Sequence, residues 1–142
     1  MYGIIEKFTP GGERECDLDI QDATGAPVYR FVFAIRNTAD TTLTVVQAST
    51  FGAPSTGTWY FLVVQHDATN NQIGISVNNG TTDTTATTGG VRDGAAPFRI
   101  GAFGNATSFF DGRIDAVMVW KRLLTAAEKA YLYDSGNGRS PL

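Results

Sequence analysis

The chain has 142 residues, of which 42% are hydrophobic and 18% are charged, and its formal net charge is −3. This length suits a single domain that buries a core without disulfides or metals. No cluster of Lys and Arg is present to neutralise phosphates, and no apolar run is long enough to span a bilayer. We therefore expect neither a nucleic-acid partner nor membrane insertion.

Cysteine and histidine each occur once, as Cys16 and His66. An intrachain disulfide is therefore impossible, and most zinc sites are excluded. The neighbours of Cys16 indicate a small buried hydrophobic residue rather than a reactive thiol. The first residues, MYGIIEKFTP, lack the basic start and apolar stretch of a signal peptide, so none is expected in this chain.

Short apolar or alternating runs, separated by turn residues, predict β-strands along most of the chain. The run at 58–67 is the most apolar and is expected to form a central strand. Asn79-Gly80 is expected to supply the left-handed residues of a tight turn. Many short strands at regular spacing favour an antiparallel sandwich or barrel. The predicted strands span residues 3–8, 14–21, 28–36, 43–48, 58–67, 72–78, 97–103 and 112–121.

One helix is predicted near the C-terminus. Thr125 and Glu128 have the spacing of a capping box, in which each side chain serves the other residue's backbone amide. Good helix formers follow, and Gly136 is the expected stop. A helix this short is not stable alone, so Leu132 and one of its neighbours, Tyr131 or Tyr133, are expected to dock it on the sandwich.

Three carboxylates alternate with three apolar residues along the second predicted strand. In an extended strand, residues i, i+2 and i+4 point to the same side. The carboxylates are Glu15, Asp17 and Asp19, and the apolar residues are Cys16, Leu18 and Ile20. We expect the apolar side to face the core and the acids to face water or a neighbouring subunit. Asp17 and Asp19 could there hold a cation or a partner's basic groups.

Two stretches resemble the laminin-G-like branch of the concanavalin A-like lectin/glucanase superfamily. The first is TGTWYFLVVQHDATNNQIGISVNNG, and the second is PFRIGAFGNATSFFDGRIDAVMVWKRLLTAAEKAYLYDSGNG. The resemblance implies an all-β fold: a two-sheet antiparallel jelly-roll sandwich with one short C-terminal helix, formed by residues 1–142 as a single domain. Trp59 lies inside an apolar run and is expected to belong to the core rather than to a ligand platform.

The resemblance further implies that this chain lacks the family's usual first strand. Met1 stands almost at the family's second motif, which is similar to GIIEKF here. An unpaired sheet edge is an aggregation hazard unless something covers it. We therefore expect a homo-oligomer or an assembly subunit.

Two sets of candidate site residues follow. Trp120 lies just before the basic pair Lys121-Arg122 and could face a cleft or an interface, so Trp120 and Arg122 are predicted to bind ligand, as are Asp17 and Asp19. Family members often place calcium ligands at strand ends, which implies a Ca²⁺ site at Asp67, Asp111 and Asp115. Each of these three aspartates also has a structural interpretation, as a turn former or a strand-end carboxylate. The family's acid after Asp115 is Ala116 here, which removes one potential ligand.

The predicted function is a non-catalytic recognition or assembly module that binds glycan or protein on an extracellular or particle surface. A structural virion component, such as a decoration or fibre protein, is the first alternative. The second is a glycoside hydrolase, because the superfamily's glucanases carry E-x-D-x-E and this chain reads Glu15, Asp17, Asp19. Retaining hydrolysis needs two carboxyl groups roughly 5–5.5 Å apart, and the shorter Asp19 makes that spacing harder to reach. We therefore expect no enzymatic activity.

Overall fold

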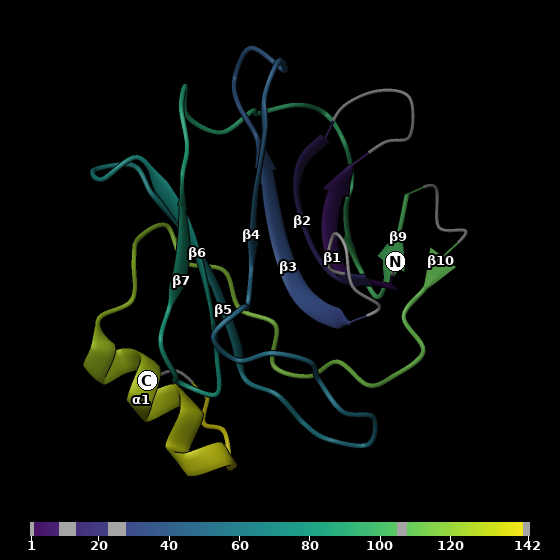
Figure 1. Ribbon diagram of the computed structural model, residues 1–142, viewed down its shortest axis with the longest axis vertical. Helices are drawn as coiled ribbons and strands as arrows, with labels where there is room; N and C mark the ends of the chain where they lie inside the picture. The colour runs from purple at the N-terminus through teal and green to yellow at the C-terminus, as the bar shows by residue number, and fades with distance from the viewer. Residues whose placement is uncertain (1, 9–13, 23–27, 105–107, 141–142) are drawn as a thin grey trace.

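The computed structural model describes every residue except 1, 9–13, 23–27, 105–107 and 141–142. Within the described residues, ten strands form three antiparallel sheets, and one α-helix follows them. The five-stranded sheet has the order β4-β3-β2-β1-β8, the three-stranded sheet has the order β5-β6-β7, and β9 pairs with β10. Figure 1 shows these sheets as successive layers, with the five-stranded sheet in the middle.

The element bounds are as follows. The five-stranded sheet consists of β1 (Tyr2–Phe8), β2 (Arg14–Asp22), β3 (Tyr29–Arg36), β4 (Leu43–Gln47) and β8 (Phe98–Ile100). The three-stranded sheet consists of β5 (Leu62–Asp67), β6 (Gln72–Val77) and β7 (Asp83–Ala86). The remaining elements are β9 (Ala102–Phe103), β10 (Ser108–Phe109), α1 (Ala126–Tyr133) and a 3₁₀ turn (Asp134–Gly136).

The apolar core lies between the five-stranded and three-stranded sheets. Alternate residues of β3 and β6 point into it, as the period of two requires. The core residues are Ile4, Leu18, Phe31, Phe33, Ile35, Val46, Ala48, Ile73, Ile75 and Val77. Cys16 packs against this core and is half-buried, and burial raises the pKa of its thiol to about 11. The predicted sandwich and the interpretation of Cys16 as a small hydrophobic residue are both confirmed.

Two expectations for the apolar run at 58–67 are wrong. β5 begins at Leu62 and lies at the edge of its sheet, because β6 is its only partner among the described strands. Trp59 precedes the strand, and 59% of its surface is exposed, so it is not a core residue. The following turn also differs, since Asn78 and Asn79 are the left-handed residues and the amide of Gly80 donates to the Val77 carbonyl.

The last two predicted strands also differ from expectation. The run at 97–103 is split into β8 and β9 at Gly101, whose φ of 75° turns the chain. Residues 112–121 form no strand at all, although their sequence alternates. The physical reason is that no other described segment pairs with them, and a strand exists only through its hydrogen-bonded neighbour.

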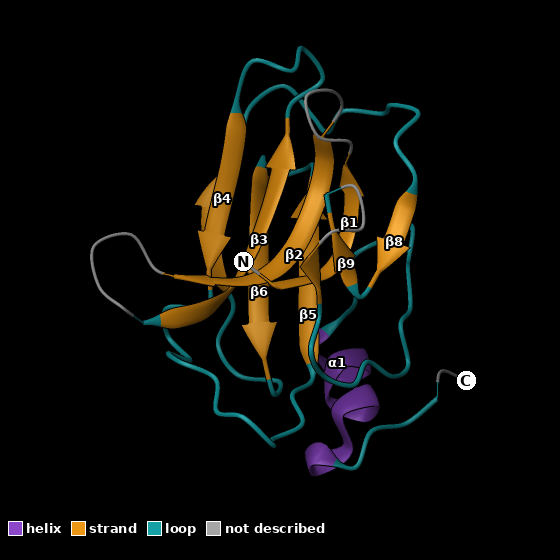
Figure 2. Ribbon diagram, turned by 90° about the vertical axis from the view of Figure 1, so that its right-hand side faces the viewer, coloured by secondary structure: helices purple, strands orange, loops and turns teal. Residues whose placement is uncertain are grey.

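The predicted helix is confirmed at one end of the sandwich (Figure 2). Both halves of its capping box are formed by Thr125 and Glu128. Leu132 is buried, and the Tyr133 ring packs on Phe61 with 5.8 Å between the ring centroids. The helix ends at Asp134 in a left-handed conformation, two residues before the expected glycine. In the part of the chain that the structure describes, no helix is long and apolar enough to cross a membrane.

Candidate functional site

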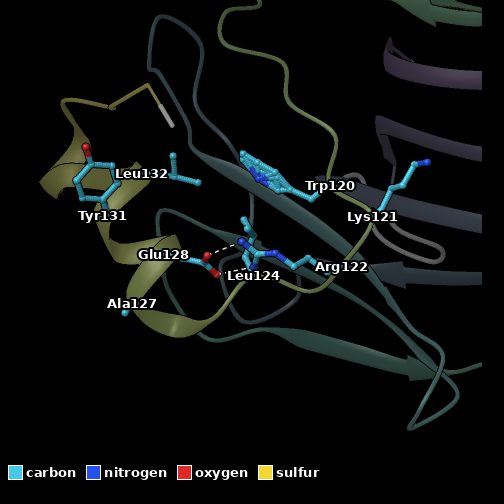
Figure 3. Close-up of a pocket in the computed structure, with 8 residues that line it drawn as sticks. All are labelled: Trp120, Lys121, Arg122, Leu124, Ala127, Glu128, Tyr131 and Leu132. Atoms are coloured by element: carbon cyan, nitrogen blue, oxygen red, sulfur yellow. Dashed lines mark hydrogen bonds and ion pairs between the residues drawn. The ribbon is translucent and has the colours of Figure 1, made fainter. Parts of the chain in front are cut away.

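An open groove lies between α1 and the segment that leads into it. Its volume is about 750 Å³. Figure 3 shows the aromatic ring of Trp120 on one side and the helix residue Leu132 opposite it. The lining residues are Trp120, Lys121, Arg122, Leu124, Ala127, Glu128, Tyr131 and Leu132.

The capping box holds one end of the groove in place. Glu128 accepts a hydrogen bond from the backbone amide of Thr125 and also pairs with Arg122 through two N–H···O contacts of 2.8 and 2.6 Å. The Arg122 guanidinium, together with the hydrogen bonds from the amide and the hydroxyl of Thr125, lowers the pKa of Glu128 to about 2. A bidentate pair of this kind fixes the orientation of both side chains. The groove therefore has a rigid polar end beside the first turn of the helix.

The remainder of the groove combines aromatic surface with charged groups. Trp120 and Tyr131 are half-buried, so each shows part of its ring to solvent. Arg139 lies over the Tyr131 ring at 5.0 Å and is itself paired with Asp134. Lys121 is exposed at the rim. Aromatic faces bordered by a few fixed polar groups are typical of small-ligand sites.

The structure brings together only part of the predicted ligand set. Trp120 and Arg122 line the same groove, and a cleft was one of the two environments considered for Trp120, the other being an interface. Ligand binding by these residues stays a prediction. Asp17 and Asp19 lie elsewhere, on the face of β2 that is opposite the core. Tyr131 and Glu128 were not predicted as site residues. Their spacing on the predicted helix was the available signal, because residues three apart lie next to each other on one face of a helix.

The prediction that the acids of β2 face water or a neighbouring subunit is wrong. Glu15, Asp17 and Asp19 do point away from the apolar core, but all three are buried. The cover comes from strands that are distant in sequence. β9 packs so closely over Gly3, the partner of Asp19 in β1, that a Cβ there would lie 2.7 Å from that of Phe103.

Most of these buried acids are satisfied by fixed partners. Arg14 donates to both oxygens of Asp17, at 2.6 and 2.7 Å. Glu15 pairs with Lys7 at 2.7 Å and accepts the amide of Gly94. A further acid, Glu6, lies opposite Asp17 in the register and was not singled out from the sequence. It accepts hydrogen bonds from Arg99 and from the amide of Gly104.

Asp19 is the exception among these acids. Its side chain is fully buried, and neither carboxylate oxygen has a hydrogen-bond partner among the described residues. Burial, with the neighbouring charge of Asp17 as the next cause, raises the pKa of Asp19 from 3.8 to about 7. Arg14 acts in the opposite direction. A protonated Asp19 would have one donor to offer Asp17, so the buried environment favours the neutral form.

The predicted calcium ligands do not come together. Asp67 accepts hydrogen bonds from the Asn70 side chain and from the amides of Asn70 and Thr69, which lower its pKa. Asp111 and Asp115 are exposed. Within the described ranges, no three His, Cys, Asp or Glu side chains are placed to hold a metal ion. Asp67 thus serves as a turn former, which was its structural interpretation, and a calcium ion stays a prediction.

The five-stranded and three-stranded sheets enclose the core as an antiparallel β-sandwich, with an open groove beside α1. The family model Laminin_G_3, described as the concanavalin A-like lectin/glucanases superfamily, matches residues 8–128. The chain belongs to this superfamily, and the resemblance seen in its sequence is confirmed. No curated protein and no solved structure matches the chain. Membership fits a carbohydrate- or protein-binding module, although the superfamily also includes glycosidases.

Proposed function

We propose that the protein is a non-catalytic carbohydrate-binding module, and that the groove beside α1 holds one ring of a sugar chain against Trp120. The observation that carries the proposal is the groove itself, in which a half-buried indole lies next to a fixed Arg122–Glu128 pair. An indole offers a large flat apolar surface with little conformational entropy to lose on binding. The apolar face of a pyranose ring matches such a surface.

Hydrogen-bonding groups at the polar end of the groove would orient the sugar. Arg122 donates to Glu128 through both terminal nitrogens and to the carbonyl of Leu123. A guanidinium has five N–H donors, so two remain for hydroxyl groups of a ligand. Because the ion pair holds the guanidinium in one orientation, little further ordering is needed when the sugar binds.

The buried acids support binding rather than hydrolysis. A glycoside hydrolase that used Glu15 and Asp19 would need both carboxyl groups in contact with the sugar. Both are buried under other strands, and Glu15 is already bonded to Lys7 and to the amide of Gly94. This is why the glycoside hydrolase is the weakest of the three functions considered. An extracellular or virion surface is the proposed location, because surface glycans would be the ligands.

The test is a glycan array followed by affinity electrophoresis on the polysaccharide that the array retains best. We expect Trp120→Ala to weaken retention at least tenfold, because stacking on an aromatic ring would supply much of the binding energy. Trp59→Ala is the matched control, since Trp59 is an exposed tryptophan outside the groove. The absence of retention on every glycan, or an equal loss in both variants, would refute the proposal.

A second candidate function, a structural subunit of a virion or other particle, is favoured by a different observation. Three apolar side chains near the groove are exposed rather than packed: Val117, Val119 and Leu123. Exposed apolar residues that lie close together often mark a protein interface.

A further inference from the structure

Residues 112–121 have the sequence of a strand but pair with no other described segment. Among the described residues, their backbone groups form no backbone–backbone hydrogen bond. The segment is also accessible, because Val119 is 79% exposed and Arg113, Asp115 and Lys121 are exposed too. The amide of Ala116 donates to the Asp115 carboxylate at 2.7 Å. An exposed row of N–H and C=O groups that lack backbone partners is a template on which another strand can pair.

The conformation of the segment is also strained at one residue. Ala116 has a φ of 50°, in the left-handed region, which carries a steric cost for a non-glycine residue. Half-buried and exposed residues would otherwise alternate along the segment, with Ile114 and Met118 half-buried. Ala116 lies between these two and is exposed, so it breaks the alternation. Pairing with another strand would return Ala116 to the extended region and release that cost.

The outward side of the segment is complementary to itself. Its side chains run Asp115, Val117, Val119 and Lys121, with an acid at one end, a base at the other and two valines between. When two such strands pair antiparallel about a two-fold axis at Met118, each Asp115 lies opposite Lys121 and each Val117 lies opposite Val119. Opposite charges and β-branched pairs directly across a sheet are both stabilising.

The two neighbouring registers of the same two-fold pairing are less favourable. A shift that moves the axis to residue 117 places Arg113 opposite Lys121, which sets two like charges across from each other. A shift that moves the axis to residue 119 places Lys121 opposite Val117 and leaves Asp115 opposite Leu123. Only even shifts keep the outward residues on one face, and of these three registers the one centred on Met118 pairs opposite charges at both ends.

We propose that residues 112–121 carry the interface of a homodimer, in which residues 115–121 of two copies pair antiparallel about Met118 as a two-stranded ribbon. The occupant of this surface is therefore a second copy of the chain. An isologous contact of this kind closes on itself and yields a dimer rather than a fibre. The inference does not rest on sugar binding, and the two are read by separate assays.

The first measurement is sedimentation velocity of the full chain over concentrations from about 1 μM to about 1 mM. We expect a monomer–dimer equilibrium. Asp115→Lys and Lys121→Asp each replace two favourable cross-strand pairs with two repulsive ones, so each single variant should weaken the dimer roughly tenfold or more. Backbone amides of residues 114–122 should gain protection from hydrogen exchange as the dimer forms.

Mixing the two single variants provides the decisive test. In the mixed dimer, the introduced lysine of D115K would face the introduced aspartate of K121D at one end, and a native Lys121–Asp115 pair would form at the other. An equimolar mixture should therefore dimerise about as well as the native chain. Arg113→Glu is the matched control, because it reverses a charge on the same strand face but lies opposite Leu123 in the proposed register. It should leave the dimer within about threefold of the native affinity.

Four results would contradict the proposed dimer. A chain that stays monomeric up to about 1 mM has no such interface. A dimer that both charge reversals leave unchanged uses another surface. A dimer that R113E weakens as much as K121D responds to net charge and not to the register, and a failure of the mixture to restore association excludes the pairing about Met118.

Discussion

Replacing Asp19 by Asn should change how the stability of the protein depends on pH. The native carboxyl group is fully buried beside Asp17 and has no hydrogen-bond donor among the described residues. Asparagine resembles the protonated form of aspartate: it is neutral, and its amide can donate to the Asp17 carboxylate. The variant therefore keeps the favourable state of residue 19 at every pH, whereas the native chain must remove its proton as the pH rises.

The magnitude follows from the pKa of Asp19, which rises from 3.8 to about 7 on folding. Each tenfold change in a proton dissociation constant corresponds to about 1.4 kcal/mol. The free energy of unfolding of the native chain therefore falls by about 4 kcal/mol when Asp19 ionises. Because the folded-state pKa is the higher one, the folded protein binds more protons than the unfolded chain between these values. The contribution of protonated Asp19 to the free energy of unfolding is therefore fully present below pH 3.8, and it is lost as the pH rises through about 7.

The assay is urea unfolding of the native chain and the Asp19→Asn variant at pH values from 4 to 9. We expect similar stability near pH 4, and at pH 8 a variant that is more stable by about 4 kcal/mol, or about 10 °C in melting temperature. Asp111→Asn is the matched control, because it removes one carboxylate at an exposed position outside this buried cluster. Parallel pH profiles for the native chain and D19N would refute the account of Asp19.

Two further predictions concern the helix cap and the calcium ion. Thr125→Ala removes the hydroxyl that accepts a hydrogen bond from the amide of Glu128, so it should lower the free energy of unfolding by about 1 kcal/mol. Thr125→Ser keeps a hydroxyl and should lower it much less. Equal losses in the two variants would contradict the capping role. A calcium ion at Asp67, Asp111 and Asp115 requires that EGTA lower the melting temperature, because an ion bound only to the native state must stabilise it. An unchanged melting temperature, with Ca²⁺ added or removed, would exclude that ion.

Several features could be predicted from the sequence because they depend on neighbours along the chain. The capping box of Thr125 and Glu128 involves residues three apart, and the structure forms it as expected. The alternation in β2 correctly separated Leu18, which faces the core, from Asp17, which faces away from it. A period of two determines which side a residue points to, and it needs no knowledge of the rest of the fold.

The sequence could not predict what covers each side. Asp17 and Asp19 are buried because β9, a strand from far along the chain, packs against β1. The same limit explains Trp59, whose apolar surroundings in the sequence suggested a core position although more than half of its surface is exposed. Burial is a property of contacts between distant segments, and a local pattern carries no information about them.

The sequence by itself thus determined the type of sandwich, the capped helix and the side on which most strand residues lie. Only the tertiary structure decided that the acids of β2 are enclosed, that Trp120 and Tyr131 share one groove, and that residues 112–121 pair with no other described segment. The physical reason is that local conformation follows from sterics and hydrogen bonds between near neighbours. Enclosure, grooves and unpaired edges depend instead on which distant surfaces meet.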